Sequence, residues 1–577
     1  MANSIKKRGQ KIARKFSRAS IKASENSRKH IKENFINRIS HVESIRLLVF
    51  EWMLMISALI ILAIAQAFWF GNSYAEDVFT TGGTYTEATL GEVGSLNPLF
   101  ATTSSEKALS KLLFATISNN DYSGHPGIGL AESIRADENG KTWIVKLRDN
   151  LKWSDNEPIT NDDVLFTIQL IKDPSVNSIY DSDLSNVKAT VNEAGEIVFS
   201  LPTPYADFMS ALDFPIVPKH ILENVNPKTL VEDSFSVSPV TSGAFFYNAT
   251  QTSADGERVY YLSSNPDYYK GKTMLSSFAI HTYNTKDSII NAINTGSVTA
   301  TAELSEIDAS QINTSQFIQK NTSLNSGAFI FFNTSHENVK QRDLREAIRQ
   351  GIDLSTIRAQ APDTLTLDYP LINAQIQIEN YPDLPEHNAE EAKAKIAELS
   401  AENPIHIDIA TVNSGYLPNV AASIKSELEN LGIEATVSAY EENQDFITNI
   451  ISKRNYDILV YEIELGADPD LLPYYHSSQA SAGGLNLSNY KDTLVDDLLL
   501  GARDTLDEEL RIKKYESFLE RWVTNVPAIG LYRANLTYFY NKNVKTFGND
   551  VKPVTAIDRF VDISSWSVSK TTKNKTP

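Results

Sequence analysis

Hydrophobic and polar positions change their period in the first third of the chain, which predicts a strand followed by a helix. Trp143, Val145 and Leu147 occupy every second position, the period of a half-buried strand. After a turn rich in Asp, Asn and Pro, Thr160 is placed as a helix N-cap with Asp163 three residues on. Apolar residues then recur at i, i+4 and i+7, so the next segment is an amphipathic helix. This stretch is therefore predicted to be a structural scaffold and not a reaction centre, since it holds no nucleophile beside a base.

Strand and helix periods alternate again between residues 405 and 463. The pattern predicts strands at 405–409, 433–439 and 457–463 with helices between them, and Gly432 as a helix C-cap. This β-α-β-α-β order predicts a parallel sheet with right-handed crossovers. Ligands of such sheets bind beyond the carboxyl ends of the strands. The candidate ligand-binding residues at and near those ends are Asn413, Ser414, Tyr416, Tyr461, Glu464 and Asp468.

The N-terminal part of the chain predicts a membrane anchor. Residues 1–46 hold 13 of the 53 Lys and Arg residues and only three of the 72 acidic residues. Leu47–Phe70 follows with one charge, and 24 helical residues span about 36 Å, enough to cross a bilayer. The positive-inside rule places 1–46 in the cytoplasm and the chain after Gly71 outside the cell. A cleaved signal peptide is the alternative, because Ser73–Ala75 offers a small-x-small cleavage site.

The composition of the chain excludes several kinds of chemistry for the part after the predicted membrane anchor. The chain has no cysteine, so disulfides, thiol catalysis and a lipid-modified cysteine are excluded. Its histidines are separated in sequence and lack metal-binding spacings, and no nucleophile-elbow motif occurs. We therefore expect no metal, no cofactor and no enzymatic activity. The basic tail is expected to lie near anionic lipid rather than to bind nucleic acid.

The turn between the first strand and helix resembles the fingerprint of the family 5 extracellular solute-binding proteins. The family pattern runs LR-x-x-V-K-W-x-D-G-x-P-h-T-A-x-D-V, where h is apolar. The matching residues are Leu147-Arg148, Leu151-Lys152-Trp153, Asp155-Asn156, Pro158-Ile159-Thr160 and Asp163-Val164. Asn156 replaces the usual Gly, and Asn is the next most tolerant residue of a left-handed turn.

Further segments resemble the same family in the same order, from about residue 82 to about 535. They are Gly82–Ala88 with Ser95–Pro98, Pro239–Phe245, Asn265–Lys272, Phe332–Thr334 with Arg342–Ile348, and Asp468–Asp470 with His476-Ser477. The resemblance implies an α/β fold of the two-lobed periplasmic-binding-protein type (type II), here with an N-terminal transmembrane helix. The implied divisions are tail 1–46, transmembrane helix 47–70, linker 71–81, lobe I 82–282, lobe II 283–525, lobe I return 526–570 and polar tail 571–577.

The resemblance also implies a function. It predicts a membrane-anchored receptor that captures a peptide-like solute and delivers it to the permease of an ABC transporter. A sensory or structural surface protein that keeps the fold is the alternative. In peptide-binding members an aspartate holds the peptide's amino terminus, and alignment places Leu465 at that position with Glu464 beside it. The expectation is that Glu464 or Asp468 pairs with a cationic group of the solute, while Asn413, Ser414 and Tyr416 contact its polar backbone.

Overall fold

The computed structural model describes residues 25–26, 28–29, 46–184, 186–253, 257–372, 376–441 and 444–574. The chain forms two compact units, one of residues 1–78 with 571–577 and one of residues 79–570. Nearly all of the predicted tail 1–46 lies outside the described residues. Strands β1 (Ala75–Thr80) and β18 (Ser569–Asn574) form a two-stranded sheet of their own.

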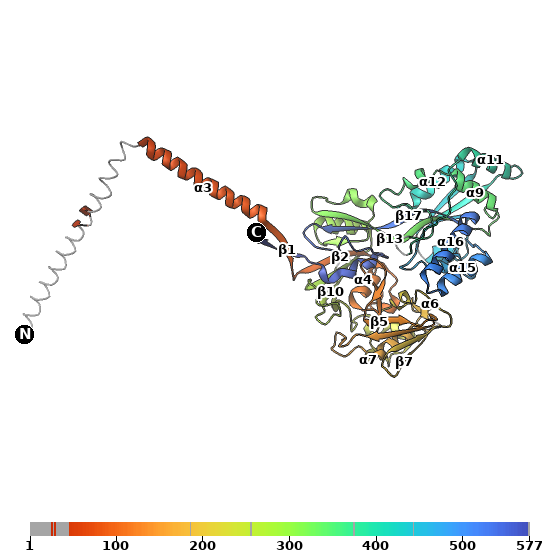
Figure 1. Ribbon diagram of the computed structural model, residues 1–577, viewed down its shortest axis with the longest axis horizontal. Coiled ribbons are helices and arrows are strands. Elements are labelled where there is room, and N and C mark those ends of the chain that lie inside the picture. Colours follow the sequence, from red (N-terminus) through yellow and green to blue (C-terminus); the bar gives the residue numbers. More distant parts are fainter. Residues whose placement is uncertain are drawn as a thin grey trace, which may run out of the picture. The chain divides into compact units, whose positions relative to one another are not determined.

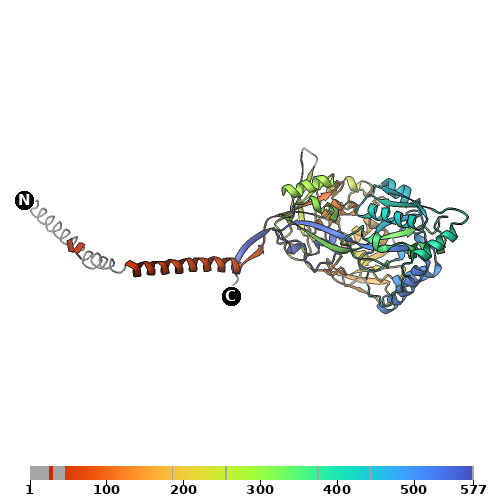
Figure 2. The same ribbon diagram turned by 90° about the horizontal axis from the view of Figure 1, so that it is seen from above.

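The N-terminal unit contains one long apolar helix, α3 (Arg46–Tyr74), which runs without interruption in Figure 2. Its 29 residues span about 44 Å, longer than the hydrocarbon core of a bilayer. The window Val49–Gln66 has a mean hydropathy of 2.0, and none of it is buried against the protein. A core helix of a soluble protein would bury such residues, so α3 has the length, composition and exposure of a membrane-spanning helix. The predicted span 47–70 lies within it.

The strand and helix predicted from the first pattern are confirmed. They are β6 (Thr142–Leu147) and α5 (Asn161–Ile171), and Thr160 and Asp163 form the predicted capping box. Asn156 has φ 73°, the left-handed conformation expected for the position where the family has Gly. Strand β6 belongs to a four-stranded antiparallel sheet of order β5-β6-β8-β7, with β5 (Ala131–Ala136), β8 (Ile197–Ser200) and β7 (Lys188–Val191).

A ten-stranded mixed sheet runs through the large unit in the order β15-β14-β16-β13-β17-β12-β2-β11-β10-β9. Its strands are β15 (Glu434–Tyr440), β14 (His406–Val412), β16 (Ile458–Glu464), β13 (Phe317–Phe332), β17 (Ala528–Asn541), β12 (Ala300–Thr301), β2 (Thr84–Leu90), β11 (Ser277–Tyr283), β10 (Arg258–Ser264) and β9 (Phe245–Thr252). Strands β14, β15 and β16 are parallel, as the second pattern predicts. Helix α12 (Leu417–Asn430) connects β14 to β15.

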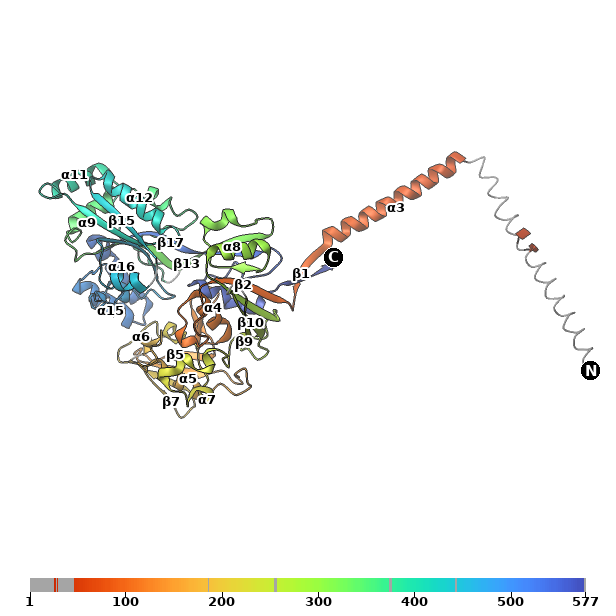
Figure 3. The same ribbon diagram turned by 180° about the vertical axis from the view of Figure 1, so that it is seen from behind.

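The helices gather around the two halves of this sheet. Figures 1 and 3 show one group beside β13–β16 and α4 with α8 near β2. The first group is α9 (Arg342–Gly351), α11 (Ala389–Leu399), α12, α15 (Thr493–Asp504) and α16 (Glu508–Asn525), together with the short α10 (Leu354–Arg358) and α14 (Leu472–Tyr475). Near β2 lie α4 (Ser104–Leu113) and α8 (Lys286–Thr295), whereas α5, α6 (Asp181–Leu184) and α7 (Lys219–Leu222) lie beside the four-stranded sheet.

Two long antiparallel strands, β13 and β17, connect two separate hydrophobic cores. One core runs from Ala328 to Tyr532 in sequence, and the other contains residues before Ala300 and after Leu536. The pairing of β13 with β17 shifts register between Ser323 and Gly327, which is a bulge at the crossing. We propose that lobe II runs from about 328 to 532 instead of 283–525, because α8 packs against β2 and β12 pairs with it.

A buried ion pair joins three distant segments of lobe I. Arg559 donates to Glu87 Oε1 through Nε at 3.2 Å and Nη2 at 2.5 Å, and both side chains are less than 5% exposed. The Tyr538 hydroxyl donates to Glu87 Oε2 at 2.6 Å and is itself 2.8 Å from the Tyr85 hydroxyl. Each charge is therefore met by an opposite charge or a hydroxyl, which is the condition for burying it.

We predict that Arg559→Met lowers the free energy of unfolding by about 3–5 kcal/mol, because Glu87 then keeps a buried charge without a partner. Glu87→Gln in the same chain should restore part of the loss. Denaturant titration of the three proteins measures this. Arg135→Met is the matched control, since Arg135 is 49% exposed in its pair with Glu196, and its midpoint should stay close to the parent's. An Arg559→Met protein as stable as the parent would contradict the role of the pair.

Candidate functional site

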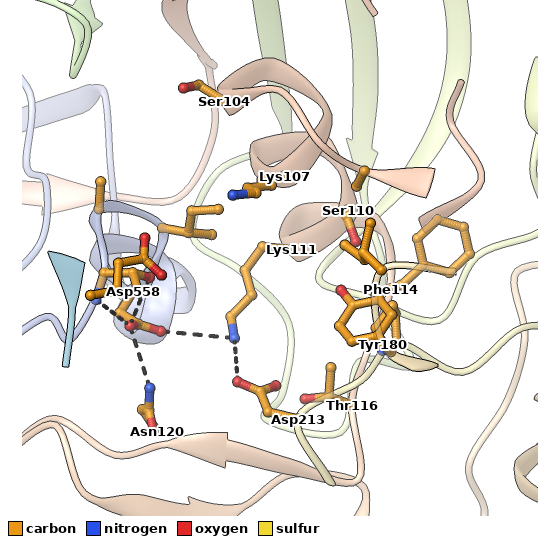
Figure 4. Close-up of a pocket in the computed structure, with 17 residues that line it drawn as sticks. Ser104, Lys107, Ser110, Lys111, Phe114, Thr116, Asn120, Tyr180, Asp213 and Asp558 are labelled. Carbon is orange, nitrogen blue, oxygen red and sulfur yellow. Dashed lines mark hydrogen bonds and ion pairs between the residues drawn. The ribbon is translucent and has the colours of Figure 1, made fainter. Parts of the chain in front are cut away.

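A cavity of about 490 Å³ lies between the two lobes and is drawn in Figure 4. Its size is within the range of small-molecule sites. Most of its wall comes from lobe I, and lobe II contributes Glu464 from the end of β16. The lining residues are Ala101, Ser104, Lys107, Ser110, Lys111, Phe114, Thr116, Asn120, Ile179, Tyr180, Asp213, Pro215, Glu464, Thr555, Ala556, Ile557 and Asp558.

Helix α4 provides a polar face of the cavity. Ser104, Lys107 and Lys111 are spaced i, i+3 and i+7, so one face of the helix carries them, and Figure 4 shows them on the cavity side. The other face buries Leu109 and Leu112 in the lobe I core. Amphipathic spacing thus both anchors the helix and directs its polar side chains at the cavity.

The start of α4 is fixed by Glu106 and Thr103, which form a capping box. The Glu106 carboxylate accepts hydrogen bonds from the backbone amides of Gly94, Ser95, Thr102 and Thr103. Burial by itself raises the pKa of Glu106, but these amide donors outweigh it and the pKa is lowered. Glu106 therefore stays ionised and holds the helix start in place.

One end of the cavity is a cluster of polar and charged side chains around Lys111. The Lys111 amine lies 2.8 Å from Asn119 Oδ1, 3.5 Å from Asp213 Oδ2 and 4.0 Å from Asp558 Oδ1. Burial alone lowers the pKa of Lys111, but Asp213 and Asp558 outweigh it and raise the pKa. Asp558 also accepts from Thr555 and Asn120, which positions the start of the helix η10 (Ala556–Ser565). Lys111 therefore has anionic partners before any solute enters, and the two carboxylates leave this cluster with one excess negative charge.

Tyr180 and apolar side chains complete the wall. Burial, followed by the charge of Asp213, raises the pKa of Tyr180, so its hydroxyl is a neutral hydrogen-bonding group. Phe114, Ile179 and Ile557 supply apolar surface nearby. A cavity of this kind suits a solute with an apolar part and a few polar groups.

Three of the six predicted ligand-binding residues line cavities. Glu464 lines the cavity between the lobes. Ser414 and Tyr416 line a second cavity of about 240 Å³ near the crossing strands, which shares Ala556 with the first. The Tyr416 hydroxyl donates to Glu306 Oε2 at 2.5 Å. The structure thus brings these three residues to one region, although not to one cavity.

The other three predicted residues lie elsewhere. Both carboxylate oxygens of Asp468 accept from Arg511, at 2.5 and 2.9 Å. The Asn413 side chain donates to Glu441 Oε1 at 2.9 Å. Tyr461 is partly buried against the lobe II core, with its ring centroid 6.0 Å from that of Phe446. None of the three is among the residues lining the cavity between the lobes.

Sequence reasoning missed the residues that lobe I contributes. The polar face of α4 has helical spacing and could have been found from Ser104, Lys107 and Lys111. Asp213 and Asp558 gave no such signal, because each lies 100 residues or more from α4 in the sequence. Within the part of the chain that the structure describes, no three His, Cys, Asp or Glu side chains converge as metal ligands would.

Known proteins resemble this chain along most of its length. The sequence model of bacterial extracellular solute-binding proteins, family 5 Middle, matches residues 126–484. The oligopeptide-binding protein AppA of Bacillus subtilis is 24% identical over 480 residues, which cover 79% of this chain and 87% of AppA.

Solved structures share the fold. AppA of Bacillus subtilis in complex with a nonapeptide superposes with a TM-score of 0.69 at 22% identity, covering 85% of this chain and all of AppA. NikZ of Campylobacter jejuni in complex with Ni(L-His) gives a TM-score of 0.70 at 22% identity, covering 84% of this chain and 99% of NikZ. The fold is the predicted two-lobed periplasmic-binding-protein fold. Because the family match spans more than half of the residues, this chain belongs to family 5 of the bacterial extracellular solute-binding proteins.

Proposed function

We propose that this protein is a membrane-anchored receptor that captures a peptide-like solute outside the cell and delivers it to the permease of an ABC transporter. The observation that carries the proposal is the cavity of about 490 Å³ enclosed by α4 of lobe I and Glu464 of lobe II. A site built from both lobes stabilises their closed arrangement when it is filled, because the solute then contacts both. Relatives of this chain include oligopeptide-binding proteins, which supports a peptide-like solute.

The solute's cationic group is proposed to bind at Glu464. This carboxylate lines the cavity, is exposed, and forms no hydrogen bond or ion pair among the described residues. Asp468, the other predicted carboxylate, is not retained, because Arg511 already occupies both of its oxygens. Ser414 and Tyr416 are proposed to contact a part of the solute that extends toward the second cavity.

The anchor is proposed to be α3, retained in the mature protein, with the large unit outside the cell. Its exposed apolar window and the basic residues before it support this orientation. No catalytic role, bound cofactor or nucleic-acid partner is part of the proposal. AppA, the relative named above, is an oligopeptide-binding protein by name.

We predict that protease added to intact cells removes the large unit and leaves residues 1–70 with the membrane, because the Lys and Arg bias places the tail inside. Immunoblots with antibodies against each end measure it. A soluble form beginning near Glu76 would show that the helix is cleaved as a signal peptide. Protection of the large unit would contradict the orientation.

We predict that Glu464→Gln weakens binding of solutes with a free amine by about tenfold or more, since a charge-assisted hydrogen bond is lost from a site that closes around it. Native mass spectrometry identifies the co-purified solute, and calorimetry with that solute measures the loss. Glu402→Gln, an exposed glutamate of lobe II outside the cavity, is the matched control. Equal affinity of Glu464→Gln and the parent would place the solute's cation elsewhere.

A further inference from the structure

Two of the five charged side chains lining the cavity between the lobes have no ionic partner. Lys111 pairs with Asp213 and Asp558, and this cluster carries one excess negative charge. Lys107 of lobe I and Glu464 of lobe II form no ion pair among the described residues, and no contact within 4.0 Å joins them. The cavity therefore presents one free cation and one free anion on facing lobes.

We infer that Lys107 is a specificity-determining residue that binds an anionic group of the solute, a step that rests on the proposed function. A carboxylate in this cavity is repelled by Glu464 and attracted by Lys107, because the two charges lie on opposite sides. Lys107 stands on α4 between Ser104 and Ser110, whose hydroxyls also line the cavity (Figure 4). A lysine flanked by hydroxyls can donate several hydrogen bonds to one carboxylate.

Lys111 cannot take this role, although it lies one turn further along the same helix. Its amine donates to Asn119 and forms ion pairs with Asp213 at 3.5 Å and Asp558 at 4.0 Å. Of the two lysines that line the cavity, Lys107 is the one without an ionic partner among the described residues. The preferred solute thus carries both charges, with its cation toward lobe II and its anion toward lobe I.

The test uses two tripeptide pools, one with free carboxyl termini and one with the same sequences amidated. Native mass spectrometry of the full chain in lipid nanodiscs measures binding of each. The parent should bind the free-acid pool about tenfold better than the amide pool. Lys107→Gln should remove that preference, while Lys188→Gln, an exposed lysine of lobe I outside the cavity, should keep it.

The outcomes separate the two claims. Binding of either pool by the parent supports a peptide-like solute. A parent without preference for free acids, or a Lys107→Gln protein that keeps the preference, would overturn the role of Lys107 alone. A parent that binds neither pool would overturn the peptide proposal and this inference with it.

The lobes also touch outside the cavity, at a seam between the loop 204–207 of lobe I and helix α15 of lobe II. The backbone amide of Ala206, in lobe I, donates to Arg503 O of lobe II at 2.8 Å. The Arg503 guanidinium lies 5.2 Å from the centroid of the Tyr205 ring. Asp207 follows directly and is only 8% exposed. The loop 204–207 is therefore packed against α15 in this arrangement of the lobes.

The charges at the seam do not balance. On the lobe II side, Arg511 pairs with Asp468 and Arg503 pairs with Asp470, each at 2.5 Å. These two pairs are neutral by themselves. Asp207 adds a third carboxylate, and its hydrogen-bond donor is the Ser210 hydroxyl at 2.5 Å, a neutral group. With three carboxylates and two guanidiniums, the closed seam carries one excess negative charge.

We propose that this seam is a proton-sensitive latch, in which Asp207 takes up a proton when the lobes close. The groups that act on Asp207 are the carboxylates of Asp468 and Asp470, the guanidinium of Arg511 and the hydroxyl of Ser210. Protonating Asp207 removes the excess charge and makes its carboxyl a donor. Acid conditions then favour the closed lobes.

The direction of the effect follows from linkage. Burial, and next the Asp468 carboxylate, raise the pKa of Asp207 in the closed seam well above its usual value. In open lobes the Asp468 and Asp470 carboxylates of lobe II move away from Asp207, so its pKa returns toward the ordinary aspartate value. Closure therefore binds a proton, so the closed state is most favoured at low pH and becomes less favoured as pH rises through the raised pKa.

The test reads lobe closure without any solute. The chain has no cysteine, so Glu193→Cys and Glu398→Cys place one dye on an exposed site of each lobe of the full chain in nanodiscs. Single-molecule energy transfer from pH 5 to pH 8 gives the closed fraction. In the parent, the closed-to-open ratio should fall with pH by at most about tenfold per unit. In Asp207→Asn it should be higher at pH 8 and independent of pH.

Two variants make the test specific. Ser210→Ala removes the hydroxyl that lowers the pKa of Asp207, so its transition should move to higher pH. Asp149→Asn, an exposed aspartate of lobe I, should behave like the parent. An Asp207→Asn protein whose closed fraction falls with pH as steeply as the parent's would overturn the latch, as would a Ser210→Ala transition at lower pH.

Discussion

The buried pair of Glu87 and Arg559 is the constraint on which the site depends. It joins β2, near the start of the large unit, to η10 near its end, with Tyr538 of β17 between them. Charges buried this deeply tolerate little displacement, because either one left alone is costly. Asp558 is the residue before Arg559, and Ala556 and Ile557 precede it in the cavity wall. The pair thus holds one wall of the cavity in place.

Hydrogen bonds at the crossing strands connect lobe I to lobe II. Asn325, in the bulge of β13, donates its backbone amide to Val554 O of lobe I. Its carbonyl accepts from Leu465 N at 2.7 Å, and its side chain donates to Gly466 O at 3.1 Å. Asn325 therefore contacts both the lobe I return and the loop directly after Glu464. Val554 precedes the cavity-lining Thr555, so these hydrogen bonds connect the two sides of the cavity wall.

The sequence predicted what depends on neighbours along the chain. Strand β6, the capping box of Thr160, the left-handed Asn156 and the parallel strands β14–β16 all follow from local patterns, and the structure confirms them. The cavity does not follow in this way. Its wall combines α4 with Asp213 and Asp558, and contacts between segments so far apart leave no periodic trace in one sequence. Of the residues in its wall, only Glu464 was predicted, from the rule that ligands bind beyond the carboxyl ends of parallel strands.

The carboxylates that follow strand β16 show why counting carboxylates is insufficient. Asp468 lies where the rule places it and Asp470 lies beside it, yet Arg511 pairs with the first and Arg503 with the second. A carboxylate is available to the cation of a solute only if no arginine of the protein already pairs with it. In the cavity, Glu464 therefore remains available to the solute, and at the seam Asp207 has no cation of its own. Whether an arginine pairs with a carboxylate thus decides which carboxylate can bind a solute or take up a proton.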